Sequence, residues 1–108
     1  MKEWVSQLRR GLLDFCILNL LSHGESYGYE IVQRLRSIEE LAVNESTVYP
    51  ILARLREEEY LKVRVVASPG GPPRRYFALT RLGESYVREM NDYWDALVEA
   101  VQKTRESV

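Results

Sequence analysis

Histidine and cysteine are almost absent from this chain of 108 residues, in which His23 and Cys16 are the only residues of these two types. A structural zinc site takes four such ligands, so one chain cannot build it, and a single cysteine forms no internal disulfide. The sequence also has no glycine-rich phosphate loop and no Ser/His/Asp set or other catalytic grouping that we can assemble. We therefore expect a protein that is not an enzyme and that uses neither a metal nor a cofactor.

Long apolar runs are also missing. None approaches the roughly 20 residues that a membrane-spanning helix requires, and the longest candidate, residues 12–21, is interrupted by Asp14 and Asn19. The first ten residues, MKEWVSQLRR, lack the layout of a signal peptide. With 45% hydrophobic and 29% charged residues, the composition is typical of one soluble domain. We expect a cytoplasmic protein that does not enter a membrane.

The net charge of −1 does not by itself indicate a nucleic-acid partner, but the charges are unevenly distributed. Residues 61–81 contain five basic and no acidic side chains, whereas residues 82–108 contain three basic and six acidic ones. Either segment is also consistent with an ordinary solvated face. A basic segment that follows a helix with a polar face favours contact with phosphates.

Residues 44–61 form the stretch around which the rest of the chain is organised. Their apolar positions follow the i, i+3, i+4, i+7 spacing of an amphipathic helix: Val48, Ile51, Leu52 and Leu55. Asn44 is suited to cap this helix with its side-chain oxygen. Pro50 lies beyond the first turn, so either the helix begins nearer Thr47 or it bends at the proline.

The opposite face of this helix carries hydrogen-bonding side chains of several lengths: Ser46, Thr47, Tyr49 and, one turn later, Arg54. Such groups suit the base edges and phosphates of a DNA groove, although an ordinary surface helix has a similar pattern.

Three further helices are expected, at residues 4–22, at 27–37 after the cap Ser26, and from the cap Thr80 to about residue 104. The first is apolar on both sides from residue 12 onward, so its outer face requires a cover: Val5, Leu8, Leu12 and Phe15. The last carries a short heptad-like seam: Val87, Met90, Trp94, Leu97 and Val101. We expect a homodimer joined through these two surfaces. The alternative is a last helix that folds back on its own domain.

Between the third and last helices, residues 61–67 and 75–79 are expected to form a β-hairpin. In the first strand, Leu61, Val63 and Val65 alternate with Lys62 and Arg64, which is typical of a half-buried strand. The intervening SPGGPP (68–73) is a turn sequence. Basic residues bracket the tip, Arg74 and Arg75 among them.

The order of helix, helix, helix, hairpin and helix predicts a winged helix-turn-helix of the α+β class, mostly α. In such a domain the helix after the turn enters the major groove and the hairpin touches an adjacent backbone. We expect residues 1–80 to form this domain, with the first helix also in dimer contact, and residues 81–108 to form a C-terminal dimerisation helix. A dimer would meet two half-sites about one duplex turn apart, as in a pseudo-palindromic operator.

From about residue 8 to residue 101 the chain resembles the PadR-type transcriptional regulators. The matching pieces are LRRGLLDFCILNLL (8–21), SYGYEIVQRL (26–35), ESTVYPILARL (45–55) and GGPPRRYFALTRLG (70–83). The family's T-x-Y-P stands here at residues 47–50, which makes Pro50 a normal feature of its recognition helix, and the wing's G-G-x-x-R-x-Y stands at residues 70–76. One departure is Tyr60, where the family usually ends this helix with glycine.

The resemblance implies a repressor-like dimer in which the recognition helix and Tyr27 contact DNA and the wing arginines contact phosphate. Together with the residue patterns above, it gives an expected DNA-binding set: Tyr27, Asn44, Ser46, Thr47, Tyr49, Arg54, Lys62, Arg64, Arg74 and Arg75.

The single C-terminal helix is similar to the subgroup that includes multidrug-sensing regulators. This resemblance implies a flat apolar pore at the dimer centre, with an expected ligand set of Leu8, Gly11, Leu12, Phe15, Trp94 and Val98. A paired Trp94 would offer a stacking platform for planar aromatic molecules, or it would simply fill the dimer core. Asp14 would favour a cationic ligand if it pointed inward.

We therefore expect a transcriptional repressor whose affinity for operator DNA is modulated by a small planar aromatic or hydrophobic effector at the dimer interface. The alternative is a winged-helix module for protein interactions that does not bind DNA. The basic segment and the polar face of residues 44–61 count against this alternative.

Overall fold

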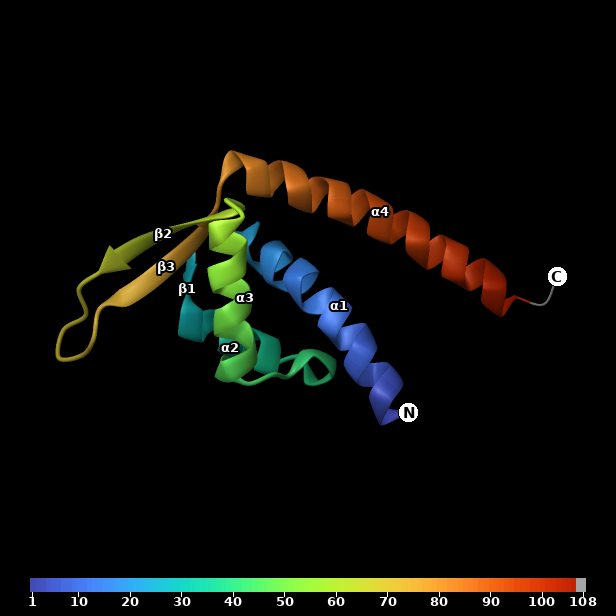
Figure 1. Cartoon of the computed structure of the whole chain (residues 1–108), viewed down its shortest axis with the longest axis horizontal. Helices are drawn as coiled ribbons and strands as arrows, with labels where there is room; N and C mark the ends of the chain where they lie inside the picture. The colour runs from blue at the N-terminus through green and yellow to red at the C-terminus, as the bar shows by residue number, and fades with distance from the viewer. Residues whose placement is uncertain (107–108) are drawn as a thin grey trace.

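In the computed structural model, which describes residues 1–106, a small antiparallel sheet lies at one side of the helices, and its β2–β3 hairpin projects away from them (Figure 1). The elements are α1 (Lys2–Leu21), β1 (Ser26–Tyr27), α2 (Gly28–Arg36), the 3-10 helix η1 (Glu39–Leu41), α3 (Glu45–Glu57), β2 (Leu61–Val66), β3 (Arg74–Leu79) and α4 (Arg81–Arg105). These bounds differ from the expected ones by a residue or two, and the mostly helical winged helix-turn-helix is confirmed. None of the helices within residues 1–106 is long and apolar enough to cross a membrane.

The sheet has the order β1-β3-β2, and all of its pairs are antiparallel. In the hairpin, Leu61 pairs with Leu79 and Val63 with Phe77, so the apolar residues near its base face the core. Val65 is 61% exposed, because the hairpin extends beyond the core before its tip (Figure 1). The third strand, β1, was not predicted, since two residues are too few to show an alternating pattern.

The core lies where the apolar stripes of α1, α2 and α3 meet. Its fully buried side chains are Ile17, Leu18, Ile31, Val32, Leu35, Val48, Leu52 and Leu55. Each of them contributes roughly 1.5–3 kcal/mol by leaving water. This packing fixes α3 at a defined angle on α2 and leaves its other face exposed.

Val87 also belongs to this core, where only 5% of its surface is exposed. Its assignment to the dimer seam was therefore wrong. The seam residues follow one periodic pattern along α4, but the first turns of this helix still lie over their own domain. Farther along, α4 extends past the domain in the direction opposite to the wing (Figure 1).

Helix α3 begins at Glu45 with Asn44 as its N-cap and runs through Pro50, so a start nearer Thr47 is ruled out. The Asn44 side chain makes no capping hydrogen bond, contrary to the expectation. Because proline has no N–H, the carbonyl of Ser46 one turn earlier loses its helical partner.

The end of α3 has the geometry of a Schellman motif. The amide of Tyr60 donates to the carbonyl of Leu55 over 3.0 Å, and the amide of Glu59 donates to that of Arg56 over 2.9 Å. The left-handed residue of this turn is Glu59, with φ 68°. Tyr60 was expected to stand where the family has glycine at the end of this helix. The residue with the left-handed conformation that favours glycine is instead Glu59, one residue earlier.

The end of α3, the base of the wing and the start of α4 meet at Thr80. The hydroxyl of Thr80 accepts from the amide of Gly83, as expected for the cap, and donates to the carbonyl of Glu59. The amide of Thr80 donates to the carbonyl of Tyr60, whose ring stacks on Tyr86 with centroids 4.2 Å apart. A Cβ atom on Gly83 would lie 2.1 Å from the Tyr60 oxygen, so only glycine fits there.

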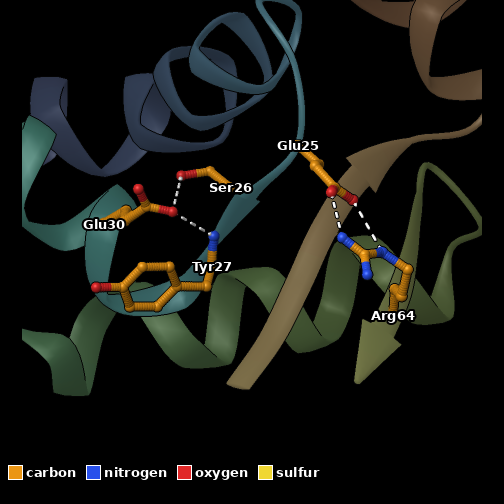
Figure 2. A network of polar contacts seen from close by, with 5 residues as sticks. All are labelled: Glu25, Ser26, Tyr27, Glu30 and Arg64. Carbon is orange, nitrogen blue, oxygen red and sulfur yellow. Dashed lines mark hydrogen bonds and ion pairs between the residues drawn. The ribbon is translucent and has the colours of Figure 1, made fainter. Parts of the chain in front are cut away.

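The N-terminal end of α2 also differs from the expectation, because its N-cap is Tyr27 and not Ser26. The Glu30 carboxylate accepts hydrogen bonds from the Tyr27 amide at 3.0 Å and from the Ser26 hydroxyl at 3.3 Å (Figure 2). Glu30 therefore satisfies the backbone at the start of the helix, while Ser26 is buried in β1.

Candidate nucleic-acid interface

A cleft of about 970 Å³ separates the exposed face of α3 from the β2–β3 hairpin, and we call it the wing cleft. Its lining includes Tyr27, Tyr29, Tyr49, Arg56, Arg74 and Arg75. Helix α3 supplies one wall because Tyr49 and Arg56 are seven residues apart, which places them on one face of a helix. The hairpin supplies the opposite wall with its two arginines. The walls thus combine aromatic and cationic groups.

The structure brings four of the expected DNA-binding residues together in the wing cleft: Tyr27, Tyr49, Arg74 and Arg75. Asn44 and Thr47 lie instead in a groove of about 620 Å³ between α1 and the start of α3, beside Lys2, Arg9 and Arg10. Ser46 and Lys62 are exposed on α3 and β2 and line neither hollow.

Arg64 and Arg54 are held by carboxylates of the same chain. Arg64 pairs with Glu25 (Figure 2), which raises the pKa of Arg64 and lowers that of Glu25. Arg54 pairs with Asp14 of α1 and, at 2.9 Å, with Glu58. The hydrogen bond to Asp14 is the main cause of the raised pKa of Arg54.

These pairs change the expected sets. Arg54 connects α3 to α1 and is absent from the lining of the wing cleft, so it lies apart from Tyr49. Asp14 was expected to favour a cationic ligand only if it pointed inward. It pairs with Arg54 and is absent from the lining of the apolar groove between α1 and α4 that is described below, so this condition is not met. The pairs Arg54–Asp14 and Arg64–Glu25 were not visible in the sequence, because their partners are about 40 residues apart.

A series of aromatic contacts joins the wing to the start of α2. The Arg74 guanidinium lies 4.7 Å from the centre of the Tyr27 ring, and Tyr27 meets Tyr76 edge to face at 5.6 Å. On the far side of Tyr76, Arg64 lies 5.2 Å from the ring centre. Cations over aromatic rings are attracted by the ring quadrupole. These contacts hold the wing, and Arg74 with it, at the edge of the wing cleft.

A second surface of different chemistry is formed by α1 and α4, which we call the apolar face. Its exposed side chains are Trp4, Val5, Leu8, Tyr93, Leu97, Val98 and Val101. It contains a groove of about 390 Å³, the apolar groove, which is lined by Gly11, Leu12, Phe15, Glu89, Met90, Tyr93, Trp94 and Leu97. The Phe15 and Trp94 rings lie 5.6 Å apart at its floor.

The apolar groove contains four of the six expected ligand residues, while Leu8 and Val98 lie outside its lining. The lining residues that the expected sets missed include Tyr29, Arg56 and Glu89. Arg56 could have been found, because it is two helical turns from Tyr49. Glu89 follows from the spacing to Tyr93 on α4. Among the described residues no group of three or more His, Cys, Asp or Glu side chains is placed to hold a metal ion.

Solved structures with the same fold include a PadR-like transcription factor from Bacteroides fragilis, 40% identical, with a TM-score of 0.80 over 92% of this chain and 95% of that one. A PadR family regulator from Eggerthella lenta is 30% identical, with a TM-score of 0.88 over 99% and 93%. The PadR protein of Bacillus subtilis, solved with operator DNA, is 25% identical, with a TM-score of 0.69 over 73% of this chain and 46% of its own.

The family model for the PadR-like transcriptional regulators matches residues 17–89, which include α2, α3 and the whole wing. This match covers more than half of the chain, and the two more similar structures carry the same family description. Members of this family regulate transcription and are not enzymes. The chain belongs to the PadR-like family of transcriptional regulators.

Proposed function

We propose that this regulator is a homodimeric repressor that binds a pseudo-palindromic operator in double-stranded DNA and responds to a small aromatic effector. Residues 1–80 are its DNA-binding domain, and residues 81–108, of which 107 and 108 lie outside the described part of the chain, form its dimerisation segment. The observation that carries the proposal is the wing cleft beside the exposed face of α3.

The wing cleft fits a DNA backbone that runs beside the major groove. Helix α3 offers Ser46 and Tyr49 on an exposed face, and the wing offers Arg74 and Arg75 at the rim. Protein hydrogen bonds to phosphates fix the register on DNA, whereas contacts to base edges read the sequence. The related Bacillus subtilis protein was solved with operator DNA, which supports the same partner here.

The apolar face supports dimerisation. Helix α4 has 25 residues, and its second half exposes Leu97, Val98 and Val101. A contiguous exposed apolar surface of this kind marks an interaction site. A second copy related by a two-fold axis covers the same surface on both chains and sets the spacing of the two α3 helices.

The apolar groove supports an effector site at this interface. The half-buried rings of Phe15 and Trp94 offer stacking surfaces to a planar molecule. Glu89 is the only carboxylate in the lining, so it favours a ligand with positive charge. Such a ligand shifts operator affinity only by binding one dimer conformation more tightly than another.

DNA binding is tested by fluorescence anisotropy with the duplex upstream of the chain's own gene, titrated at several salt concentrations. We expect binding that weakens as salt rises and that is reduced by Tyr49→Ala. If the duplex is not bound at any salt concentration, the regulator proposal fails and the protein-interaction alternative replaces it.

The effector site is tested through the fluorescence of Trp94 in a Trp4→Phe background, which leaves one tryptophan. We expect the planar cation proflavine to quench Trp94 and the anion anilinonaphthalene sulfonate to do so less, with the difference reduced by Glu89→Gln. If neither dye changes Trp94 fluorescence at saturating concentration, the groove is only the packed centre of a dimer.

A further inference from the structure

Gly28, the first residue of α2, lies directly against the ring of Tyr49 from α3. A Cβ atom built on Gly28 would be 2.5 Å from Cε1 of that ring and 3.3 Å from its Cζ and Oη atoms. Real Cβ atoms do not approach other atoms to 2.5 Å, so a side chain at residue 28 and the present ring position exclude each other. The backbone of Gly28 has no positive φ. The neighbouring ring, and not the backbone conformation, therefore requires glycine.

The Tyr49 ring is seated between two environments. One side rests on the buried Gly28, while the side chain is 41% exposed and forms part of the wall of the wing cleft. Burial is the main cause of the raised pKa of its hydroxyl, to which Glu45, Tyr29 and Tyr27 also contribute. The hydroxyl therefore stays protonated at neutral pH and can donate a hydrogen bond as well as accept one.

We infer that Gly28 is a positioning residue for DNA binding, because the absence of its side chain leaves the space in which the Tyr49 ring lies in the wall of the wing cleft. This inference rests on the proposed DNA-binding function. The residue acts through Tyr49 and does not itself need to touch the duplex. The start of α2 thus controls where a side chain of the recognition helix points.

A methyl group at residue 28 has different consequences for folding and for binding. The atoms that it meets are the far end of an exposed side chain, so Tyr49 can turn to another staggered rotamer while the core stays intact. Alanine also forms helix more readily than glycine. We therefore expect Gly28→Ala to preserve the fold and to displace only the ring.

The test is a double-mutant cycle with Gly28→Ala, Tyr49→Ala and both together, measured by anisotropy on the upstream duplex at one salt concentration. We expect each single change to weaken binding roughly tenfold, in the range of lost side-chain contacts to DNA. In the Tyr49→Ala background Gly28→Ala should have no effect, because the ring that it displaces is gone. Additive losses would overturn the inference.

The ring position has its own readout in the absence of DNA. Fluorine NMR of protein labelled with 3-fluorotyrosine gives one signal for each of seven tyrosines, and loss of a signal in Tyr49→Phe assigns Tyr49. Gly28→Ala should shift this signal while the melting temperature stays at or above that of the wild type. An unchanged Tyr49 signal would overturn the inference and leave the proposed function intact. A wild-type protein that binds no duplex would overturn both.

Discussion

The wing cleft and the apolar groove lie on one small chain but suit opposite kinds of partner. Three arginines and three tyrosines line the wing cleft, with Glu57 as its only acid. Apart from Gly11 and Glu89, the lining of the apolar groove is large apolar or aromatic side chains. The wing cleft is complementary to a polyanion, and the apolar groove is complementary to an apolar ligand or protein surface. The two hollows have no lining residue in common.

The two surfaces are connected through α1, which lines the apolar groove and also contacts α3, the helix that lines the wing cleft. Gly11, Leu12 and Phe15 form one wall of the apolar groove, while Asp14, on another side of the same helix, pairs with Arg54 of α3. Arg9 also donates a hydrogen bond to the carbonyl of Ala42, just before α3. We expect a displacement of α1 at the groove to reach α3 through these two contacts.

The largest effect should come from placing a charge on the apolar face. Leu97→Glu would bury an unpaired carboxylate between two copies, at a cost on the order of 3 kcal/mol, which weakens dimerisation about 100-fold. Analytical ultracentrifugation measures the change. Val65→Glu is the matched control, since it alters an exposed apolar residue of the wing and should leave the dimer unchanged. Equal behaviour of the two variants would remove the distinction between the surfaces.

Arginines that line the wing cleft and arginines held by carboxylates should differ in their contribution to DNA binding. Arg75→Ala removes a cation from the wing cleft, and we expect operator affinity to fall roughly tenfold and the salt dependence to decrease by about one ion. Arg54→Ala removes a guanidinium that Asp14 and Glu58 already engage, so its effect on the salt dependence should be smaller. Anisotropy titrations at several salt concentrations measure both, and a larger effect of Arg54→Ala would contradict the placement of these residues.

A third change should stabilise the protein while leaving both surfaces as they are. Glu59 has the left-handed conformation that disfavours side chains, so Glu59→Gly should raise the free energy of unfolding by about 1 kcal/mol. Glu57→Gly, at the last helical residue, should lower it by a similar amount. Urea denaturation provides the measurement, and destabilisation by both variants would show that Glu59 makes a contact that outweighs its strain.

The smallest effect concerns the exposed ion pair between Glu25 and Arg64. The hydrogen bond from Arg64 lowers the pKa of Glu25 in the folded protein. A lowered folded pKa means that the stabilisation is present above the unfolded pKa of about 4.3 and is lost as the pH falls through the folded pKa. We expect Glu25→Gln to lower the unfolding free energy more at pH 7 than at pH 3. Denaturation at the two pH values measures this, and an equal loss at both would exclude the ion pair as its cause.

Much of the fold was accessible from the sequence because its signals are local. The spacing of Val48 and Leu52 predicted α3, and the alternation in residues 61–67 with the turn after it predicted the hairpin. Thr80 was identified as a cap because a threonine hydroxyl before a helix accepts a backbone N–H. Each of these features depends on neighbours within a few residues.

The features that the sequence did not reveal depend on contacts between distant segments. The helical period placed Arg54 near the polar face, but its partner Asp14 lies 40 residues away. Val87 continues the pattern of the dimer seam, and only the packing of α4 on its own domain shows that it is buried. The contact of Gly28 with Tyr49 has no local signal, because glycine at a helix start is compatible with many neighbours.

The tight contact between Gly83 and the Tyr60 carbonyl makes the start of α4 a pivot. Tyr60 precedes β2 and Thr80 follows β3, so this contact lies at the base of the wing, and α4 extends away from it. Trp94 stands eleven residues farther along, roughly 17 Å at the rise of an α-helix. If a ligand in the apolar groove displaces Trp94, we expect a smaller displacement of Arg74 and Arg75, because these arginines lie on the other side of the contact between Gly83 and Tyr60.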